Sequence, residues 1–252
     1  MRALLSPDAS PFAELADLEA WYHVPSPHHV RANFVASLDG AIELDGRSGG
    51  LGGPGDYRVF HVLRALTDVV LVGAGTVRSE NYGPVRLDEA VQERRISRGQ
   101  APVPPVAVIT GTAGLDTDIR LFDVPTGAPH PIILTTSGSA PDDVRDALST
   151  VADVVICGEG AVDLTVAMKA LADRGLGRVL CEGGATILGQ LAREALLDEL
   201  CLTLSPVLAG PGHTALTFGH RFPAPLTLEL THLLEDGGLL LARYAAKQGA
   251  GL

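Results

Sequence analysis

The stretch Arg178-Val179-Leu180-Cys181-Glu182-Gly183-Gly184-Ala185-Thr186-Ile187-Leu188 decides the fold of this chain. A short apolar strand runs into two glycines and then directly into a helical pattern. Glycines let the backbone come close to a ligand, and the free N–H groups at a helix start face it. In an open α/β sheet, ligands bind at this carboxyl end of the strands. An ordinary tight turn is the alternative, and these residues alone leave both interpretations open.

The same alternation of strand and helix extends on the N-terminal side of this stretch. Apolar runs separated by helical patterns indicate parallel strands joined by right-handed crossovers. Strands are predicted at 68–73, 105–110, 131–136, 152–157 and 178–181, and helices at 141–148, 162–173 and 185–195.

The two ends of the chain add different elements. A first strand is predicted at 31–37, followed by a glycine-rich loop over 46–55 and a helix that starts at Pro54-Gly55-Asp56. After a strand at 199–205, the last strands, 226–234 and 239–245, form a hairpin around Asp236-Gly237-Gly238. We therefore expect an α/β fold with a mixed, mainly parallel sheet and an antiparallel C-terminal edge. Residues 1–28 are predicted to be an N-terminal arm with one helix from Pro11 to Trp21, and 29–248 a single domain.

Composition and charge exclude several classes of partner. The 252 residues carry 19 basic and 30 acidic side chains, a formal charge of −11 that disfavours nucleic acid and anionic membranes. An anionic ligand must then be held by local donors. The three cysteines are far apart and show no zinc spacing, so no metal is expected. No signal peptide or membrane-spanning run is present, and we expect a cytoplasmic protein.

A second glycine-rich turn follows the strand at 68–73. Its sequence, Val72-Gly73-Ala74-Gly75-Thr76-Val77-Arg78, begins like a dinucleotide fingerprint but has Arg78 in place of the third glycine. A standard Rossmann assignment is therefore weak. The segment remains a strand, turn and helix with Thr76 as the expected N-cap, and thus a second anion site.

Two carboxylates bracket the first glycine-rich loop. Asp56 starts a helix in an apolar stretch and is a candidate proton donor with a raised pKa, and capping of that helix is the alternative role. Asp39, after the first strand, is a second candidate, although closing a turn is the role we favour for it. Arg64, two turns into the same helix, either reaches a substrate phosphate or lies on the surface.

Taken in order, several segments resemble the pyrimidine reductase domain of riboflavin biosynthesis. They are Ser37-Leu38-Asp39-Gly40, Leu63-Arg64-Ala65, Val72–Val77, Cys181–Ala185, Asp198-Glu199-Leu200 and Ser205–Gly210. The resemblance runs from Arg31 to Tyr244. In the bifunctional enzyme this domain is C-terminal to a zinc deaminase, whose H-x-E…P-C-x-x-C signature is absent here. The chain therefore resembles a stand-alone, actinobacterial-type member.

The resemblance implies a three-layer dihydrofolate reductase-like fold, NADPH as cofactor and a homodimer. The pyrophosphate is expected between the Gly73–Thr76 and Gly183–Ile187 turns. The 2′-phosphate is expected near Thr110-Gly111-Thr112 and Thr135-Thr136-Ser137, neither of which contains an arginine. Cofactor contacts are expected at Ala36, Gly73, Gly75, Thr76, Thr110, Gly183, Gly184, Ala185, Thr186 and Ile187.

The implied reaction is hydride transfer to the sugar imine C1 of a ribosylaminopyrimidine, of the 5-amino-6-(5-phosphoribosylamino)uracil type. Asp56 and Asp39 are the expected catalytic residues, and the expected substrate contacts are Arg64, Arg86 and Glu182. One alternative is dihydrofolate reductase-type activity, because dihydrofolate reductases carry a pterin-binding carboxylate at the position that Asp56 resembles. Another is a non-catalytic NADPH-binding protein.

Overall fold

Strands and helices alternate along the computed structural model, which describes residues 1–5, 15–219 and 221–247. They group into two compact units. The central unit is Thr67–Gly184, and the terminal unit consists of Met1–Leu66 and Ala185–Leu252. The single domain expected over 29–248 stays a prediction.

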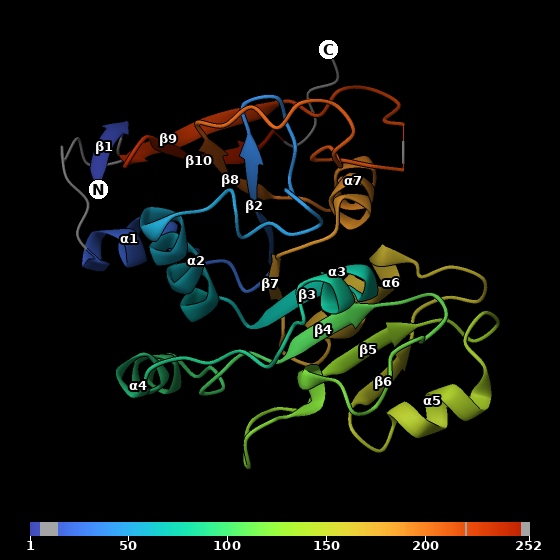
Figure 1. The fold of residues 1–252 in the computed structure, drawn as a ribbon. Coiled ribbons are helices and arrows are strands. Elements are labelled where there is room, and N and C mark those ends of the chain that lie inside the picture. The colour runs from blue at the N-terminus through green and yellow to red at the C-terminus, as the bar shows by residue number, and fades with distance from the viewer. Residues whose placement is uncertain (6–14, 220, 248–252) are drawn as a thin grey trace. The chain divides into compact units, whose positions relative to one another are not determined.

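The central unit contains five parallel strands (Figure 1). Their order is β7 (Arg178–Cys181), β3 (Val69–Gly73), β4 (Val106–Ile109), β5 (Ile132–Thr135) and β6 (Asp153–Ile156). All four apolar side chains of β3 from Val69 to Val72 are fully buried. A continuous apolar run of this kind is typical of a parallel strand covered on both faces. The predicted strands of this unit are confirmed.

The helices of the central unit were only partly predictable. Helices α5 (Asp142–Leu148) and α6 (Leu164–Ala172) lie where they were expected, and α3 (Ala74–Ser79) follows β3. Helix α4 (Glu89–Ser97) and the 3₁₀ turn Arg120–Phe122 were not predicted. The buried residue of α4 is Arg95, which donates to the carbonyl oxygens of Thr67 and Ala101. A guanidinium in place of an apolar stripe leaves no helical periodicity in the sequence.

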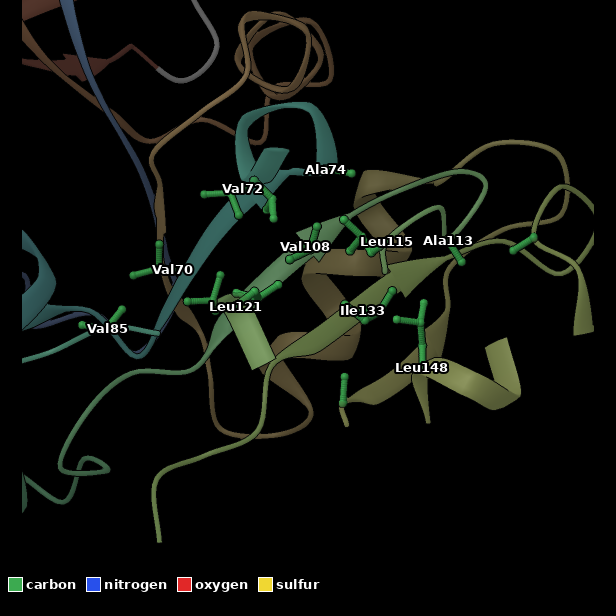
Figure 2. Packing of buried hydrophobic residues seen from close by; sticks show 14 residues of the cluster. Val70, Val72, Ala74, Val85, Val108, Ala113, Leu115, Leu121, Ile133 and Leu148 are labelled. Carbon is green, nitrogen blue, oxygen red and sulfur yellow. The ribbon is translucent and has the colours of Figure 1, made fainter. Parts of the chain in front are cut away.

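One apolar cluster connects the strands of the central unit with the loops at their carboxyl ends (Figure 2). Val72 of β3 and Ala74 of α3 belong to it, together with Ala113 and Leu115 of the loop after β4. The turn after β3 and the loop after β4 are thus fixed by a common core.

The strands of the terminal unit form the mixed part of the fold. Their order is β1 (Arg2–Leu5), β9 (Leu228–Asp236), β10 (Leu239–Ala246), β8 (Glu199–Ser205) and β2 (His29–Ser37). Only β8 and β2 among these described neighbours are parallel. Gly237 and Gly238, with φ of +60° and +90°, make the two-residue hairpin turn. The predicted mixed sheet with an antiparallel C-terminal edge is confirmed, whereas β1, within the predicted arm, was missed.

The described residues of the terminal unit form three helices. Helix α2 (Pro54–Leu66) packs against β9 and β10, and α1 (Leu15–Tyr22) packs against α2. Helix α7 (Ala185–Arg193) follows the Gly-Gly turn as predicted. The predicted start of the first helix, Pro11, lies outside the described residues. Within 1–5, 15–219 and 221–247, no helix has the length and apolarity needed to cross a membrane.

A buried group of charges fixes the C-terminal end of α1. Glu199 accepts hydrogen bonds from Arg31 and Arg243, and the same guanidiniums donate to the carbonyls of Tyr22 and Trp21. Burial alone would raise the pKa of Glu199. The hydrogen bond with His29 and the two arginine charges outweigh it, and the pKa lies well below its usual range. We call His29, Arg31, Glu199 and Arg243 the Glu199 cluster.

Candidate functional site

The two glycine-rich turns predicted separately meet within the central unit. Gly73 N–H donates to the carbonyl of Gly183 (3.2 Å), and Gly184 N–H donates to Thr76 Oγ1 (3.1 Å). A Cβ at Gly183 would lie 2.7 Å from Thr76 Cγ2, so only glycine allows this approach. We call Gly73–Thr76 and Gly183–Gly184 the paired turns.

Thr76 has a different role from the predicted one. Helix α3 begins at Ala74, and its N-cap is Gly73, with no side-chain cap hydrogen bond. The prediction of Thr76 as N-cap is therefore wrong. Its hydroxyl instead accepts from Gly184, a residue 108 positions away, and so joins the two turns.

The backbone of the paired turns is open to a ligand at Gly75. Gly75 is exposed, and a Cβ built on it would meet nothing within 4 Å. In the terminal unit, Thr186 in the first turn of α7 is exposed, whereas Ile187 is buried. Exposed backbone without side chains fits a phosphate group of a nucleotide.

The loops after β4 and β5 are joined to each other. Thr136 Oγ1 donates to the carbonyl of Gly111 (2.8 Å) and accepts from Ser139 N–H (3.2 Å). Thr110 is buried at the end of β4, and its N–H donates to Leu134 of β5. The two segments expected near a 2′-phosphate therefore lie side by side.

Glu182 has a partner that the sequence did not indicate. Tyr82, which follows α3, donates its hydroxyl to the Glu182 carboxylate. The two residues are 100 positions apart, so no local spacing signals the pair. Arg86 lies a few residues after Tyr82 with an exposed side chain. The substrate contacts expected at Glu182 and Arg86 stay predictions.

Asp56 lies in the first turn of α2 and is enclosed by two elements of the terminal unit. Thr203 Oγ1 of β8 donates to its Oδ1 (2.6 Å). Its Oδ2 lies 2.7 Å from where a Cβ on Gly52 would stand. Burial raises the pKa of Asp56, and the hydrogen bond from Thr203 partly opposes it. This carboxyl holds a proton to higher pH than an ordinary aspartate does. Thr203 was missed because it lies 147 positions away.

Asp39 is occupied by loop contacts. Its carboxylate accepts from Ser37 Oγ (2.5 Å), Ala209 N–H (3.0 Å) and Gly210 N–H (2.7 Å). The hydrogen bond from Ser37 and those from the two amides lower the pKa of Asp39 to about 2. This geometry supports the turn-closing role, and the catalytic role expected for Asp39 stays a prediction without support from its contacts.

The other two predicted site residues of the terminal unit are Arg64 and Ala36. The Arg64 guanidinium lies over the ring of Phe60, 4.0 Å from its centroid. Ala36 is buried on β2. No set of three or more His, Cys, Asp or Glu side chains is placed to hold a metal ion within the described ranges.

Comparison with known proteins identifies relatives for almost the whole chain. The family described as the RibD C-terminal domain matches residues 28–241. The chain is 26% identical over 218 residues to the 2,5-diamino-6-ribosylamino-4(3H)-pyrimidinone 5′-phosphate reductase of Archaeoglobus fulgidus, with 86% of this chain and 98% of the relative covered. The reductase of the same name from Methanothermobacter thermautotrophicus is 27% identical over 224 residues, with 87% and 98% covered.

Solved structures show the same fold. A pyrimidine reductase-like protein from Corynebacterium diphtheriae has a TM-score of 0.82 and 25% identity, covering 94% of this chain and 100% of its own. Dihydrofolate reductase from Enterococcus faecalis, at 14% identity and a TM-score of 0.50, shares the fold over 87% of this chain and 97% of its own. The predicted dihydrofolate reductase-like fold is confirmed.

Proposed function

This chain belongs to the RibD C-terminal domain family, and we propose that it is an NADPH-dependent reductase of a ribosylaminopyrimidine phosphate in riboflavin biosynthesis. The observation that carries the proposal is the match to two archaeal 2,5-diamino-6-ribosylamino-4(3H)-pyrimidinone 5′-phosphate reductases, which extends over 98% of the length of each relative.

The cofactor in this proposal is NADPH, bound at the paired turns. Gly75, which is exposed and has open space at its Cβ position, would let the backbone of the paired turns approach the pyrophosphate. The role of Thr76 in this proposal is to hold the two turns together, because its hydroxyl accepts a hydrogen bond from Gly184 N–H. Bound NADPH supplies the hydride.

Asp56 is the proposed proton donor. Hydride addition to the imine carbon C1 moves the electron pair of the C=N bond onto nitrogen, which must take up a proton. A buried carboxyl with a raised pKa is suited to hold that proton near neutral pH. Thr203 orients the carboxyl through Oδ1 and leaves Oδ2 for the proton.

The test is spectrophotometric NADPH oxidation by the purified protein. We expect oxidation with the phosphoribosylaminopyrimidine and formation of its ribityl product, identified by mass spectrometry. Turnover of dihydrofolate alone would contradict the proposed substrate. NADPH binding with neither substrate turned over would leave the protein as a non-catalytic NADPH-binding protein.

Dihydrofolate reductase-type activity remains the second candidate because of Asp56. A half-buried carboxylate in the first turn of α2 can accept hydrogen bonds from the amino-pyrimidine edge of a pterin. The same assay with dihydrofolate separates the two, since only one substrate forms a ribityl product.

The homodimer and the cytoplasmic location are further parts of this proposal. Both rest on the resemblance to the reductase family. Sedimentation equilibrium of the purified protein tests the first, and fractionation of cells tests the second.

A further inference from the structure

Arg78 occupies a position that the sequence left unexplained. It replaces the third glycine of the dinucleotide fingerprint, and the segments expected near the 2′-phosphate contain no arginine. In the structure, Arg78 on α3 extends to the loop after β4, where its guanidinium donates to the carbonyl of Gly114 (3.1 Å). A cation from α3 thus lies at the loop that follows β4.

The position of Arg78 is fixed by the core beneath it. Val77, directly before it, belongs to the buried cluster that also contains Ala113 and Leu115 on either side of Gly114. Figure 2 shows Ala113 and Leu115 among the side chains of this cluster. Arg78 and Gly114 themselves are exposed. The buried neighbours thus fix the backbone at both ends of this contact, and the guanidinium itself lies at the surface.

A second donor belongs to the same loop. Thr112 lies two residues before Gly114 and is exposed, and its Oγ1 is 3.3 Å from the point where a Cβ on Gly114 would stand. Across the described residues, no carboxylate forms an ion pair with Arg78, although Asp116 follows closely in the loop. The charge of Arg78 is thus satisfied by a neutral carbonyl and can accept an anion in addition.

The geometry of the sheet assigns an identity to that anion. In the order β7-β3-β4, the paired turns lie at the ends of β7 and β3, and Arg78 reaches to the β4 side. The β7 side carries the Glu182 carboxylate, which disfavours a phosphate. A dinucleotide places its two nucleosides on opposite sides of the pyrophosphate. We propose that Arg78, with Thr112, binds the adenosine 2′-phosphate and selects NADPH over NADH.

This inference rests on the proposed cofactor but does not depend on the substrate. The test measures binding without any substrate, by calorimetric titration with NADPH, NADH, 2′,5′-ADP and ADP. Arg78→Gln is expected to weaken NADPH and 2′,5′-ADP by about tenfold or more, the loss of a charge-assisted hydrogen bond. Its affinities for NADH and ADP should stay within about twofold. Loss of pyrimidine reduction with this selectivity intact would contradict the proposed function alone.

Arg145 offers a matched control. It also lies at these loops, but its guanidinium is held by Asp142 and by the carbonyls of Ser137 and Ala140. Arg145→Gln should leave the NADPH affinity unchanged. The proposal is overturned when Arg145→Gln causes the selective loss, when Arg78→Gln changes nothing, or when it weakens NADPH and NADH equally.

Two further measurements test the role of the Arg78 charge, and the first of them also controls for a folding defect. Arg78→Lys keeps the charge and should retain much of the preference for NADPH, with a thermal midpoint equal to that of the unmodified protein. On the unmodified protein, added salt should weaken NADPH more than NADH, since a dianion on an exposed guanidinium is screened. An equal effect of salt on both cofactors would contradict the role of Arg78.

Discussion

A carboxyl group shielded from water, as Asp56 is between Thr203 and Gly52, keeps its proton more readily than one in solution. Asp39 shows the opposite environment, with three hydrogen bonds to its ionised form. The sequence presents two aspartates beside glycines and favours a turn-closing role for Asp39, but it does not show which carboxyl is shielded. Their contacts in the folded chain do, because they involve strand β8 for one and Ala209 and Gly210 for the other.

Asp56→Asn is expected to lower kcat by a factor on the order of 10² or more, as loss of an acid catalyst does. The folded-state pKa of Asp56 is raised above 3.8, so its contribution to stability is present below that pH and is lost as the pH rises. The variant should therefore unfold at a slightly higher temperature at neutral pH. Steady-state kinetics and thermal unfolding check both, and unchanged kcat would contradict the catalytic role.

Thr203→Val is expected to shift the pH profile of kcat/KM. It removes the hydrogen bond that lowers the pKa of Asp56, so burial alone acts and the pKa rises further. Activity that requires the protonated carboxyl should then persist to higher pH. Thr203→Ser keeps the hydroxyl and should retain the original profile. An unshifted basic limb in the valine variant would show that another group donates the proton.

Gly183→Ala is expected to destabilise the protein by roughly 1–3 kcal/mol, because the new methyl group would overlap Thr76 Cγ2. Thr76→Ala removes that carbon and should recover part of the loss in the double variant. Gly75→Ala, at an open position, should have little effect. Denaturant unfolding of the unmodified protein, the two single variants at Gly183 and Thr76 and their double variant completes a double-mutant cycle, and additive effects would contradict the contact.

At the level of whole elements, the buried strands were predictable because each is a continuous run of apolar residues in the sequence. Helix α4 and strand β1 were not, for different reasons. The buried residue of α4 is the guanidinium of Arg95, so no apolar stripe marks the helix. Strand β1 has four residues, three of them exposed, and depends on pairing with β9. Both elements are specified by distant partners rather than by their own pattern.

The anchoring of α1 by the Glu199 cluster leads to a prediction about stability. Glu199→Gln should destabilise the protein by roughly 3–5 kcal/mol, since Arg31 and Arg243 would lose the charge that compensates them. The pKa of Glu199 is lowered, so its contribution is fully present above pH 4.5 and is lost as the pH falls.

The variant should consequently show a smaller loss of stability on acidification than the unmodified protein. Lys169→Gln, which breaks an exposed pair with Asp173, is the control and should change stability by no more than about 1 kcal/mol. Equal acid sensitivity of the Glu199 variant and the unmodified protein would contradict the stabilising role of the ionised Glu199 carboxylate.

At the scale of the whole molecule, the sequence predicted the mixed sheet and the two glycine turns, but not what joins them. Thr76 was expected to cap its own helix and instead reaches Gly184. Arg78 was noted only as a departure from a motif. Such contacts depend on which strands become neighbours, and strand order is not written in local periodicity. The site was therefore predictable as a set of segments and not as a set of contacts.

The division of the chain also determines an order of assembly during synthesis. The central unit is one continuous stretch, so all of its own strands have been synthesised before residues 185–252. The terminal unit, by contrast, joins two distant stretches of the chain, since Arg31 of β2 contacts Glu199, 168 residues later. The pairing of β2 with β8 and the Glu199 cluster can therefore form only after residue 199 has been synthesised.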